Sequence, residues 1–540
     1  MVKPKQYVEA HHEPKPASAS QSPNQPSFLS ALPLIFLQLG SRLFSFALNQ
    51  ALLRIATPSA FGTATIQFEL LLNTILFLSR EGVRTALLRV DSSTSSRSTA
   101  NVAFVPFFLG CPIALGAAYT YVSSAADETR AQPFFMEAVA LYVVGALVEL
   151  LKEPMHIAIM TGLDTRIRLR AEGIAVVGRS VVTLLVMYTD PLKDSPTQNR
   201  ALLAFALGQA FYAVCVEVIY LLHYGAAYLY PRKPELNKDG KAEAFFDSKV
   251  IRLSASVTFQ SLVKHFLTEG DKLLLSWFTS LEDQGGYAIA LNYGSLIARI
   301  ILQPLEETSR SIFSGLVAAK DQAGALHHLT TFLSSQVPIS LILPIFGPPF
   351  IPLAAQLLLP PQYLMTSAPE VLAAWMWYIP ILALNGQLEA FMASTANEKA
   401  MNRQSVAMAV FSAIYISSAV VAYRMDLGDA SLVYANMLNL TIRIVYALVW
   451  TREYSRGAFS WKSLLPGKSD IAVLVSSGVL VRLLGNKLGV LEVISRTGKR
   501  AFLERPVLLH VGIGGVVGVL SLGYITRRIW RSKLGRVKQE

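Results

Sequence analysis

The sequence predicts an all-α, polytopic membrane protein with about fourteen transmembrane helices, forming two six-helix lobes around a central cavity plus two C-terminal helices. Of the 540 residues, 52% are hydrophobic and 16% are charged, and the mean hydropathy is +0.42. In a soluble domain, about a quarter of the residues are charged. The apolar residues occur in runs of about 20, the length that a membrane-spanning helix needs. Polar residues inside these runs recur with a helical period, which indicates faces sheltered from lipid.

Charged residues, Pro or Gly bound each expected helix. The helices begin near Phe28, Gly62, Thr99, Pro133, Arg168, Asn199, Lys249, Gly285, Thr330, Pro369, Arg403, Ala430, Asp470 and Pro506. The longest strongly polar linker, residues 231–249, follows the sixth helix. It separates an N-terminal lobe, residues 28–230, from a C-terminal lobe, residues 250–455, and residues 469–530 hold helices 13 and 14.

The polar segments predict the orientation of the chain. Residues 1–27 are rich in Pro, Ser, Gln and His, so we expect a disordered cytosolic tail without a cleavable signal peptide. The net charge is +12, and Lys and Arg residues recur in the linker, in a basic loop at 456–468 and in a basic tail at 531–540. Because Lys and Arg favour the cytosolic side, both termini are expected there, and no nucleic-acid partner is needed. The basic segment Lys487 to Arg505 violates this rule.

Ionisable and amide side chains form stripes on several helices. In the first helix, Gln38, Arg42, Ser45 and Asn49 are spaced i, i+4, i+7 and i+11, which places them on one face. Other stripes hold Glu69, Asn73, Arg80, Glu81, Arg84, Glu149, Lys152, Glu153, Lys264, Glu269, Asn292, Arg299, Glu306, Glu389, Asn436 and Arg443. A charge at bilayer depth costs about 2.5 to 3.5 kcal/mol. A hydrated cavity between the lobes would shelter these faces.

Several carboxylates lie one helical turn from a cation. We expect Glu81 to pair with Arg84, Glu149 with Lys152, and Glu306 with Arg310. Glu153 points about 100° away from its neighbour Lys152, so Arg42 or Lys264 is its expected partner across the cavity. Buried ion pairs that only hold helices together are the alternative interpretation. The number of stripes favours a ligand cavity.

Catalytic and metal-binding patterns are not found in the sequence. Cys111 and Cys215 lie in apolar runs without His or Cys at metal spacing, so neither a disulfide nor a metal site is expected. There is no Ser-His-Asp order, HExxH or P-loop. We therefore expect no enzyme activity, no cofactor and no ATP hydrolysis.

These residues resemble a family, the eukaryotic oligosaccharide translocation proteins of the endoplasmic reticulum. The resemblance spans most of the chain and includes the run Phe77 to Arg84, the run Glu149 to Pro154, and Leu267 to Asp271. Further matching positions are Gln38, Arg42, Asn49, Asn292, Arg299, Pro304, Glu306, Asn385, Glu389, Asn436, Asn439 and Arg443. The resemblance implies the fold of the multidrug and oligosaccharidyl-lipid exporter superfamily. It also implies a dolichyl-diphosphate-linked oligosaccharide as substrate, in protein N-glycosylation.

The leading hypothesis is a flippase for this lipid in the endoplasmic reticulum membrane. Cations would bind the diphosphate by charge-assisted hydrogen bonds, namely Arg42, Arg84, Lys152, Lys264, Arg299 and Arg443. Amides would bind the sugars, namely Gln38, Asn49, Asn292 and Asn436, while Glu81, Glu153, Glu269 and Glu306 would hold the cations. The dolichyl chain would stay among membrane lipids at a gap between the lobes.

Three other classes of function are open to different degrees. A membrane chaperone or scaffold of the N-glycosylation machinery would use the same fold without transport. An exporter of small organic cations is less favoured, because the stripes carry many Arg and Lys residues. A membrane glycosyltransferase would need catalytic carboxylates in an outer loop, and Ile55 to Phe61 has none.

Overall fold

A computed structural model describes residues 47–89, 97–162, 165–191, 200–233 and 244–537. The chain divides into two compact units, Met1–Gln50 and Ala51–Glu540. In the first unit, residues 47–50 are helical. All contacts described below belong to the second unit.

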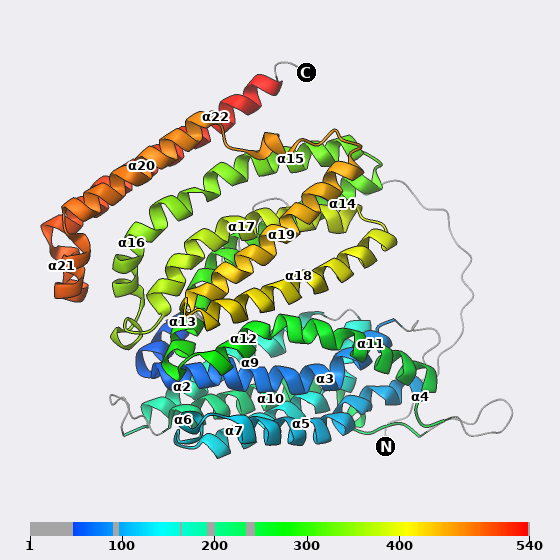
Figure 1. Ribbon diagram of the computed structural model, residues 1–540. Coiled ribbons are helices and arrows are strands. Elements are labelled where there is room, and N and C mark those ends of the chain that lie inside the picture. The colour runs from blue at the N-terminus through cyan, green and yellow to red at the C-terminus, as the bar shows by residue number, and fades with distance from the viewer. Residues whose placement is uncertain (1–46, 90–96, 163–164, 192–199, 234–243, 538–540) are drawn as a thin grey trace, which may run out of the picture. The chain divides into compact units, whose positions relative to one another are not determined.

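The described residues of the second unit are predominantly helical and contain no strand, which confirms the predicted fold class. Eleven of its described helices are long and apolar enough to cross a membrane (Figure 1). Of the other three expected spans, the one beginning at Phe28 lies outside the described residues. The remaining two coincide with α7, which has only 17 residues, and with α11, which carries Lys249, Arg252 and Lys264.

The first half of this unit contains five long helical stretches. One continuous stretch consists of α2 (Pro58–Gly62), the π-helix η1 (Thr63–Phe68) and α3 (Glu69–Leu87). A second consists of α4 (Arg97–Asn101), η3 (Val102–Phe104) and α5 (Val105–Ser124). After α6 (Asp127–Arg130) follow α7 (Phe135–Leu151), α8 (Glu153–Thr161), α9 (Thr165–Tyr188), α10 (Ala201–Tyr224) and η4 (Ala226–Leu229).

The second half contains the remaining described helices. It begins with α11 (Ser248–Thr268), α12 (Gly270–Phe278), α13 (Leu281–Ile297), the π-helix η5 (Ala298–Leu302) and α14 (Gln303–Ala318). It continues with α15 (Gln322–Ser340), α16 (Ile342–Leu358), η6 (Pro361–Tyr363), α17 (Ala368–Thr395), α18 (Glu398–Arg424), α19 (Ala430–Tyr454) and η7 (Trp461–Leu464). The chain ends with α20 (Lys468–Lys487), α21 (Val490–Thr497), η8 (Gly498–Leu503) and α22 (Arg505–Val537).

Side-chain caps explain several helix starts. The Asp247 carboxylate accepts from the Lys249 backbone N–H at 2.9 Å at the start of α11, and Asp321 accepts from Gly324 at 2.8 Å at the start of α15. The second cap corrects the sequence expectation, which placed this helix start at Thr330. His327 and His328 consequently lie inside α15 and not in a loop.

Two helix contacts position the polar stripes. Helices α3 and α11 pack so closely at Gly82 that an added Cβ atom would lie 2.0 Å from the Thr258 hydroxyl. Helices α2 and α13 cross at two glycines: a Cβ atom on Gly285 would lie 2.0 Å from the Pro58 carbonyl oxygen. Both contacts bring the backbones close, and only glycine permits such an approach.

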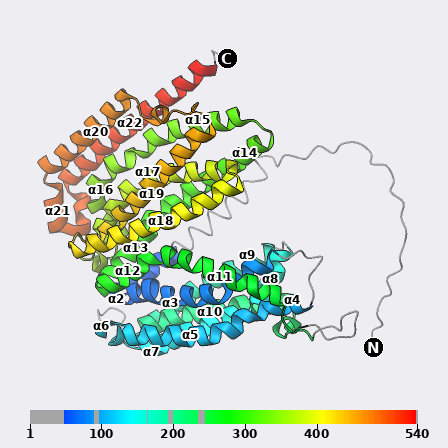
Figure 2. The ribbon, with the colours of Figure 1, turned by 45° about the vertical axis from the view of Figure 1, so that its right-hand side comes forward.

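Helices α20 and α22 form an antiparallel pair (Figure 2). Asp470 and Arg528 form an ion pair between them, and the hydroxyls of Ser477 and Ser521 lie 3.0 Å apart. The basic segment Lys487 to Arg505 connects the pair through α21 and η8. Val490 and Ile494 of α21 pack on Leu353 of α16, while the charged side chains of the segment are exposed. This segment contains no helix long and apolar enough to span a membrane.

Candidate functional site

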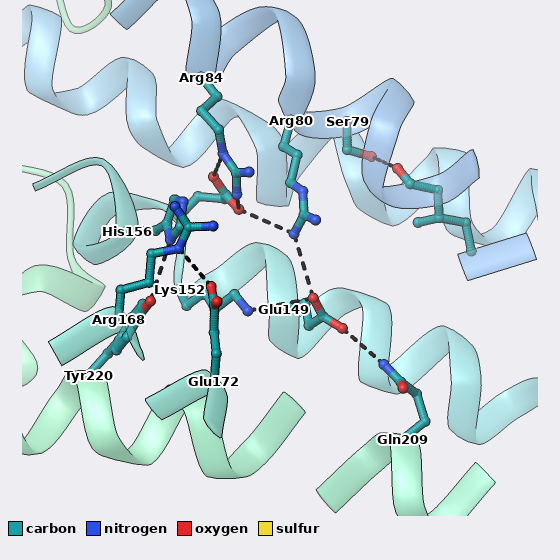
Figure 3. Close-up of polar contacts among 12 residues, drawn as sticks. Ser79, Arg80, Arg84, Glu149, Lys152, His156, Arg168, Glu172, Gln209 and Tyr220 are labelled. Carbon is teal, nitrogen blue, oxygen red and sulfur yellow. Dashed lines mark hydrogen bonds and ion pairs between the residues drawn. The ribbon is translucent and has the colours of Figure 1, made fainter. Parts of the chain in front are cut away.

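Two arginines one turn apart on α3 point toward α7 and α8 (Figure 3). The Arg84 guanidinium donates from Nε to Glu153 Oε2 at 3.0 Å and from its terminal nitrogen to Oε1, which is a bidentate contact. Arg80 lies 3.5 Å from the same carboxylate. The Glu153 side chain is completely buried. A buried carboxylate requires such partners, because leaving it unpaired costs several kcal/mol.

Glu149 is the second carboxylate of this ionic network. Its oxygens lie 3.6 Å from Arg80 and 3.5 Å from the Lys152 ammonium, and Gln209 of α10 donates to it at 3.0 Å. The Lys152 ammonium also lies 5.7 Å from the centre of the Tyr212 ring. The five charged residues, Arg80, Arg84, Lys152, Glu149 and Glu153, therefore contribute three positive and two negative charges. We call this group the ionic network.

Glu217 of α10 is close to this network. Its side chain is buried, with 6% of the residue exposed, and neither carboxylate oxygen has a hydrogen-bond partner among the described residues. Lys152 is the charged residue that acts electrostatically on it. A buried carboxyl group without a partner is far cheaper to keep neutral than charged.

A second group of charges lies nearer the start of α3. Glu69 pairs with Arg179 of α9 at 3.6 Å and with Lys272 of α12 at 3.7 Å. Lys272 also contacts Glu269 at 3.1 Å, and the Asn73 amide donates to Glu269 at 3.2 Å. This group joins α3, α9 and α12, so each of the stripes on these helices is compensated within the protein.

The polar residues of the second half form separate contacts. The Arg443 guanidinium donates from Nε to Glu389 at 3.0 Å, linking α19 to α17, and Asn436 donates to the Tyr378 hydroxyl at 3.2 Å. Arg299 donates to the Asn292 side chain at 2.9 Å. Glu306 accepts from Arg310 at 2.9 Å, one turn along α14.

These contacts test the expected ion pairs. The pairs Glu149 with Lys152 and Glu306 with Arg310 are confirmed. The expected pair of Glu81 with Arg84 is wrong, because Arg84 is turned to Glu153 while Glu81 is half-buried elsewhere on α3. Glu153 contacts Arg84 and Arg80, since α8 packs beside α3, while its expected partners, Arg42 and the Lys264 side chain, lie outside the described residues.

Of the predicted site residues, the structure brings Arg84, Lys152 and Glu153 together in the ionic network. The others that it describes belong to the separate contacts given above: Glu269, Asn292, Arg299, Glu306, Asn436 and Arg443. Gln38, Arg42 and the Lys264 side chain lie outside the described residues, and Asn49 belongs to the first unit. Sequence reasoning left out Arg80, Gln209 and Glu217 as site residues. For Gln209 and Glu217 the available signal was a polar residue within the apolar run of α10.

The helix order and packing define a class of protein, the polytopic transporter fold of lipid and multidrug exporters. The structure is similar to the lipid II flippase MurJ in an inward closed conformation, with a TM-score of 0.58 and 11% identity, covering 92% of this chain and 99% of that one. It is also similar to an inward-facing MATE-family multidrug resistance transporter, with a TM-score of 0.54 and 12% identity, covering 76% of this chain and 94% of that one.

The sequence matches the Rft protein family (Rft-1) over residues 26–527, and the chain belongs to this family. A relative from Yarrowia lipolytica is 35% identical, covering 88% of this chain and 78% of the relative. Relatives from Saccharomyces cerevisiae (28%, covering 86% and 90%) and Xenopus tropicalis (27%, covering 91% and 92%) are also similar. All three carry the name Man(5)GlcNAc(2)-PP-dolichol translocation protein RFT1.

Proposed function

We propose that this protein translocates a dolichyl-diphosphate-linked oligosaccharide across the endoplasmic reticulum membrane for protein N-glycosylation. The names of its relatives support the substrate, and the flippase-like fold supports transport rather than enzymatic chemistry. The observation that carries the proposal is the ionic network, with three cations against two carboxylates, whose two arginines lie on α3 within a stretch long and apolar enough to cross a membrane. A diphosphate is the polar group of such a lipid that most needs cations when it leaves water.

The ionic network suggests how the headgroup is held. Arg80 and Arg84 are 21% and 22% exposed, whereas the Glu153 side chain is completely buried. The guanidinium groups therefore reach the accessible side of the network, with the carboxylates behind them. Each guanidinium has five N–H donors, so Arg80 and Arg84 would donate charge-assisted hydrogen bonds to phosphate oxygens while they keep their contacts with Glu149 and Glu153. No ATP hydrolysis is required for this binding step.

The remaining predicted contacts are part of the proposal. Cations and amides of the second half would bind the other end of the headgroup, namely Lys264, Asn292, Arg299, Asn436 and Arg443. The first helix would add Gln38, Arg42 and Asn49. The dolichyl chain would remain among membrane lipids, and both termini would face the cytosol. Contacts with the N-glycosylation machinery would place the protein where its substrate is made.

Reconstitution tests this function. Purified protein in liposomes should accelerate transbilayer movement of defined dolichyl-diphosphate oligosaccharide. Arg84→Gln should abolish the acceleration, and Arg84→Lys should restore it in part, because Lys lacks the bidentate fork. Arg482→Gln is the matched control, since Arg482 is an exposed arginine of α20. Binding of the lipid without accelerated movement would contradict transport and favour a scaffold.

A further inference from the structure

A separate cavity of about 380 Å³ lies beside the first part of α3. It is bounded by α3, the end of α5, α12 and the start of α13. On α3 its lining ends at Thr74, six residues before Arg80, or about 9 Å along the helix axis. Its volume falls in the range of small-molecule sites, about 300 to 1,000 Å³. The cavity is therefore large enough for a ligand and distinct from the ionic network.

The polar lining of this cavity is held in a defined orientation. The Tyr121 hydroxyl donates to Gln67 Oε1 at 2.9 Å, and Gln67 Nε2 donates to Gln284 Oε1 at 2.8 Å. Gln284 in turn donates to the Thr279 carbonyl oxygen at 3.1 Å. Each amide has two N–H donors and two acceptor lone pairs, so these bonds leave donors and acceptors for a ligand.

The charge of the lining disfavours an anion. No described lining residue is Lys or Arg, and the two acidic residues are Glu128 and Glu269. Lys272 and Asn73 already compensate Glu269, at 3.1 and 3.2 Å. A phosphate would therefore meet carboxylates without a cation, while a bound cation would find Glu269 already neutralised.

Two aromatic side chains, Tyr121 and Trp277, line the same cavity, and Trp277 is 70% exposed. A flat aromatic face next to amide donors and acceptors matches a sugar ring, which has an apolar C–H face and hydroxyls at its edge. We propose that this cavity binds uncharged sugar residues of the lipid-linked oligosaccharide. The inference rests on the proposed function. It adds a second binding site beside α3, for sugars, to the proposed diphosphate site at the ionic network.

The test is binding of the soluble disaccharide chitobiose to the full-length protein in nanodiscs, measured by saturation-transfer NMR. Trp277→Leu should raise the dissociation constant about tenfold, because the aromatic face is lost, and Trp277→Phe should preserve most of the affinity. Trp530→Leu is the matched control, since Trp530 of α22 is similarly exposed at 66%. Equal losses in Trp277→Leu and Trp530→Leu would overturn the proposal.

A second measurement does not depend on the tryptophan. Ser276 lines the cavity, so Ser276→Cys in a chain without Cys111 and Cys215 should react with a thiol reagent more slowly when chitobiose is present. Absence of both chitobiose binding and this protection would overturn the inference. Choline binding that is lost in Glu269→Gln would also overturn it, in favour of a cation site.

Binding of inorganic diphosphate, measured beside chitobiose binding, distinguishes the proposed sugar cavity from the proposed headgroup site at the ionic network. Diphosphate binding without chitobiose binding would remove the sugar cavity and leave the ionic network intact. Chitobiose binding that depends on Trp277, without diphosphate binding, would leave the cavity and remove the proposed headgroup site.

Discussion

At the scale of single residues, Glu153 and its two arginines determine the character of the site. The carboxylate is completely buried and takes a bidentate contact from Arg84 and a weaker one from Arg80. Such a pair adds little to stability compared with apolar packing, but it is costly to break on one side only. The proposed role of these cations in binding a diphosphate accounts for a pair that apolar packing could otherwise replace.

A double-mutant cycle tests this pair. Arg84→Gln alone should lower the free energy of unfolding by on the order of 3 kcal/mol, because a buried carboxylate loses its main partner. The double variant Arg84→Gln with Glu153→Gln should be more stable than Arg84→Gln. Denaturant unfolding in detergent measures both. Arg168→Gln, which breaks the more exposed pair with Glu172 at 2.9 Å, is the control and should cost less than about 0.5 kcal/mol.

For Glu217 we expect the opposite effect on stability: its replacement should not lower the stability of the protein. Because its buried carboxyl group has no hydrogen-bond partner among the described residues, a neutral isostere should replace it without loss. Glu217→Gln should match or exceed the wild type in thermal stability, with normal N-glycosylation in a complementation assay. Normal stability combined with lost glycosylation would instead show that the charged or proton-carrying form takes part in transport.

At the scale of elements, α2 and α13 meet without intervening side chains. Gly62 and Gly285 lie at this crossing, and Gln67 and Gln284 hydrogen-bond at 2.8 Å beside it. Backbone contact leaves no room for a small shift between these helices. If the protein works by alternating access, we expect this crossing to separate at the ends of α2 and α13.

Gly285→Val tests the crossing. Its side chain would meet the Pro58 carbonyl, where even a Cβ atom would be at 2.0 Å, and should hold the helices apart. We expect loss of complementation with normal abundance and faster thiol labelling of a Ser59→Cys reporter. Gly315→Val on α14 is the matched control, because nothing lies within 4 Å of a Cβ atom there. Unchanged labelling in Gly285→Val would refute the closed crossing.

At the scale of the whole molecule, the amphipathic connection between α20 and α22 is the one segment that violates the charge rule. Its charged side chains are exposed while Val490 and Ile494 are buried, so these charges need not lie in the hydrocarbon, although the predicted topology still places them on the lumenal side. An even number of spans with both termini in the cytosol is then consistent with the remaining loop charges.

Protease protection in sealed microsomes tests this topology. Tags after Glu540 and within the linker 231–249 should be digested, while a tag inserted at Lys499 should be protected. Solubilising the membrane with detergent should expose all three tags equally. Protection of the first or second tag would require an odd number of spans before it.

The sequence by itself determined the helices and the striped faces. Length and hydropathy define spans because a bilayer requires about 20 apolar residues, and a helical period of 3.6 places Arg80 and Arg84 on one face whatever surrounds them. It also predicted the local pair of Glu149 with Lys152, since residues one turn apart are neighbours on a helix, although Glu81 and Arg84 have the same spacing and do not pair. The substrate came from the resemblance to a family and not from these patterns.

Only the tertiary structure decided which distant side chains meet. Glu153 contacts Arg84, 69 residues away, because α8 packs beside α3, and nothing in the spacing of either helix encodes that neighbour. Gln209 joins the network for the same reason, through the packing of α10 on α7. Lateral packing depends on the shapes of whole helix faces, including glycines such as Gly82 that allow α11 to approach α3. The sequence therefore predicted a charged site, and the packing determined which residues form it.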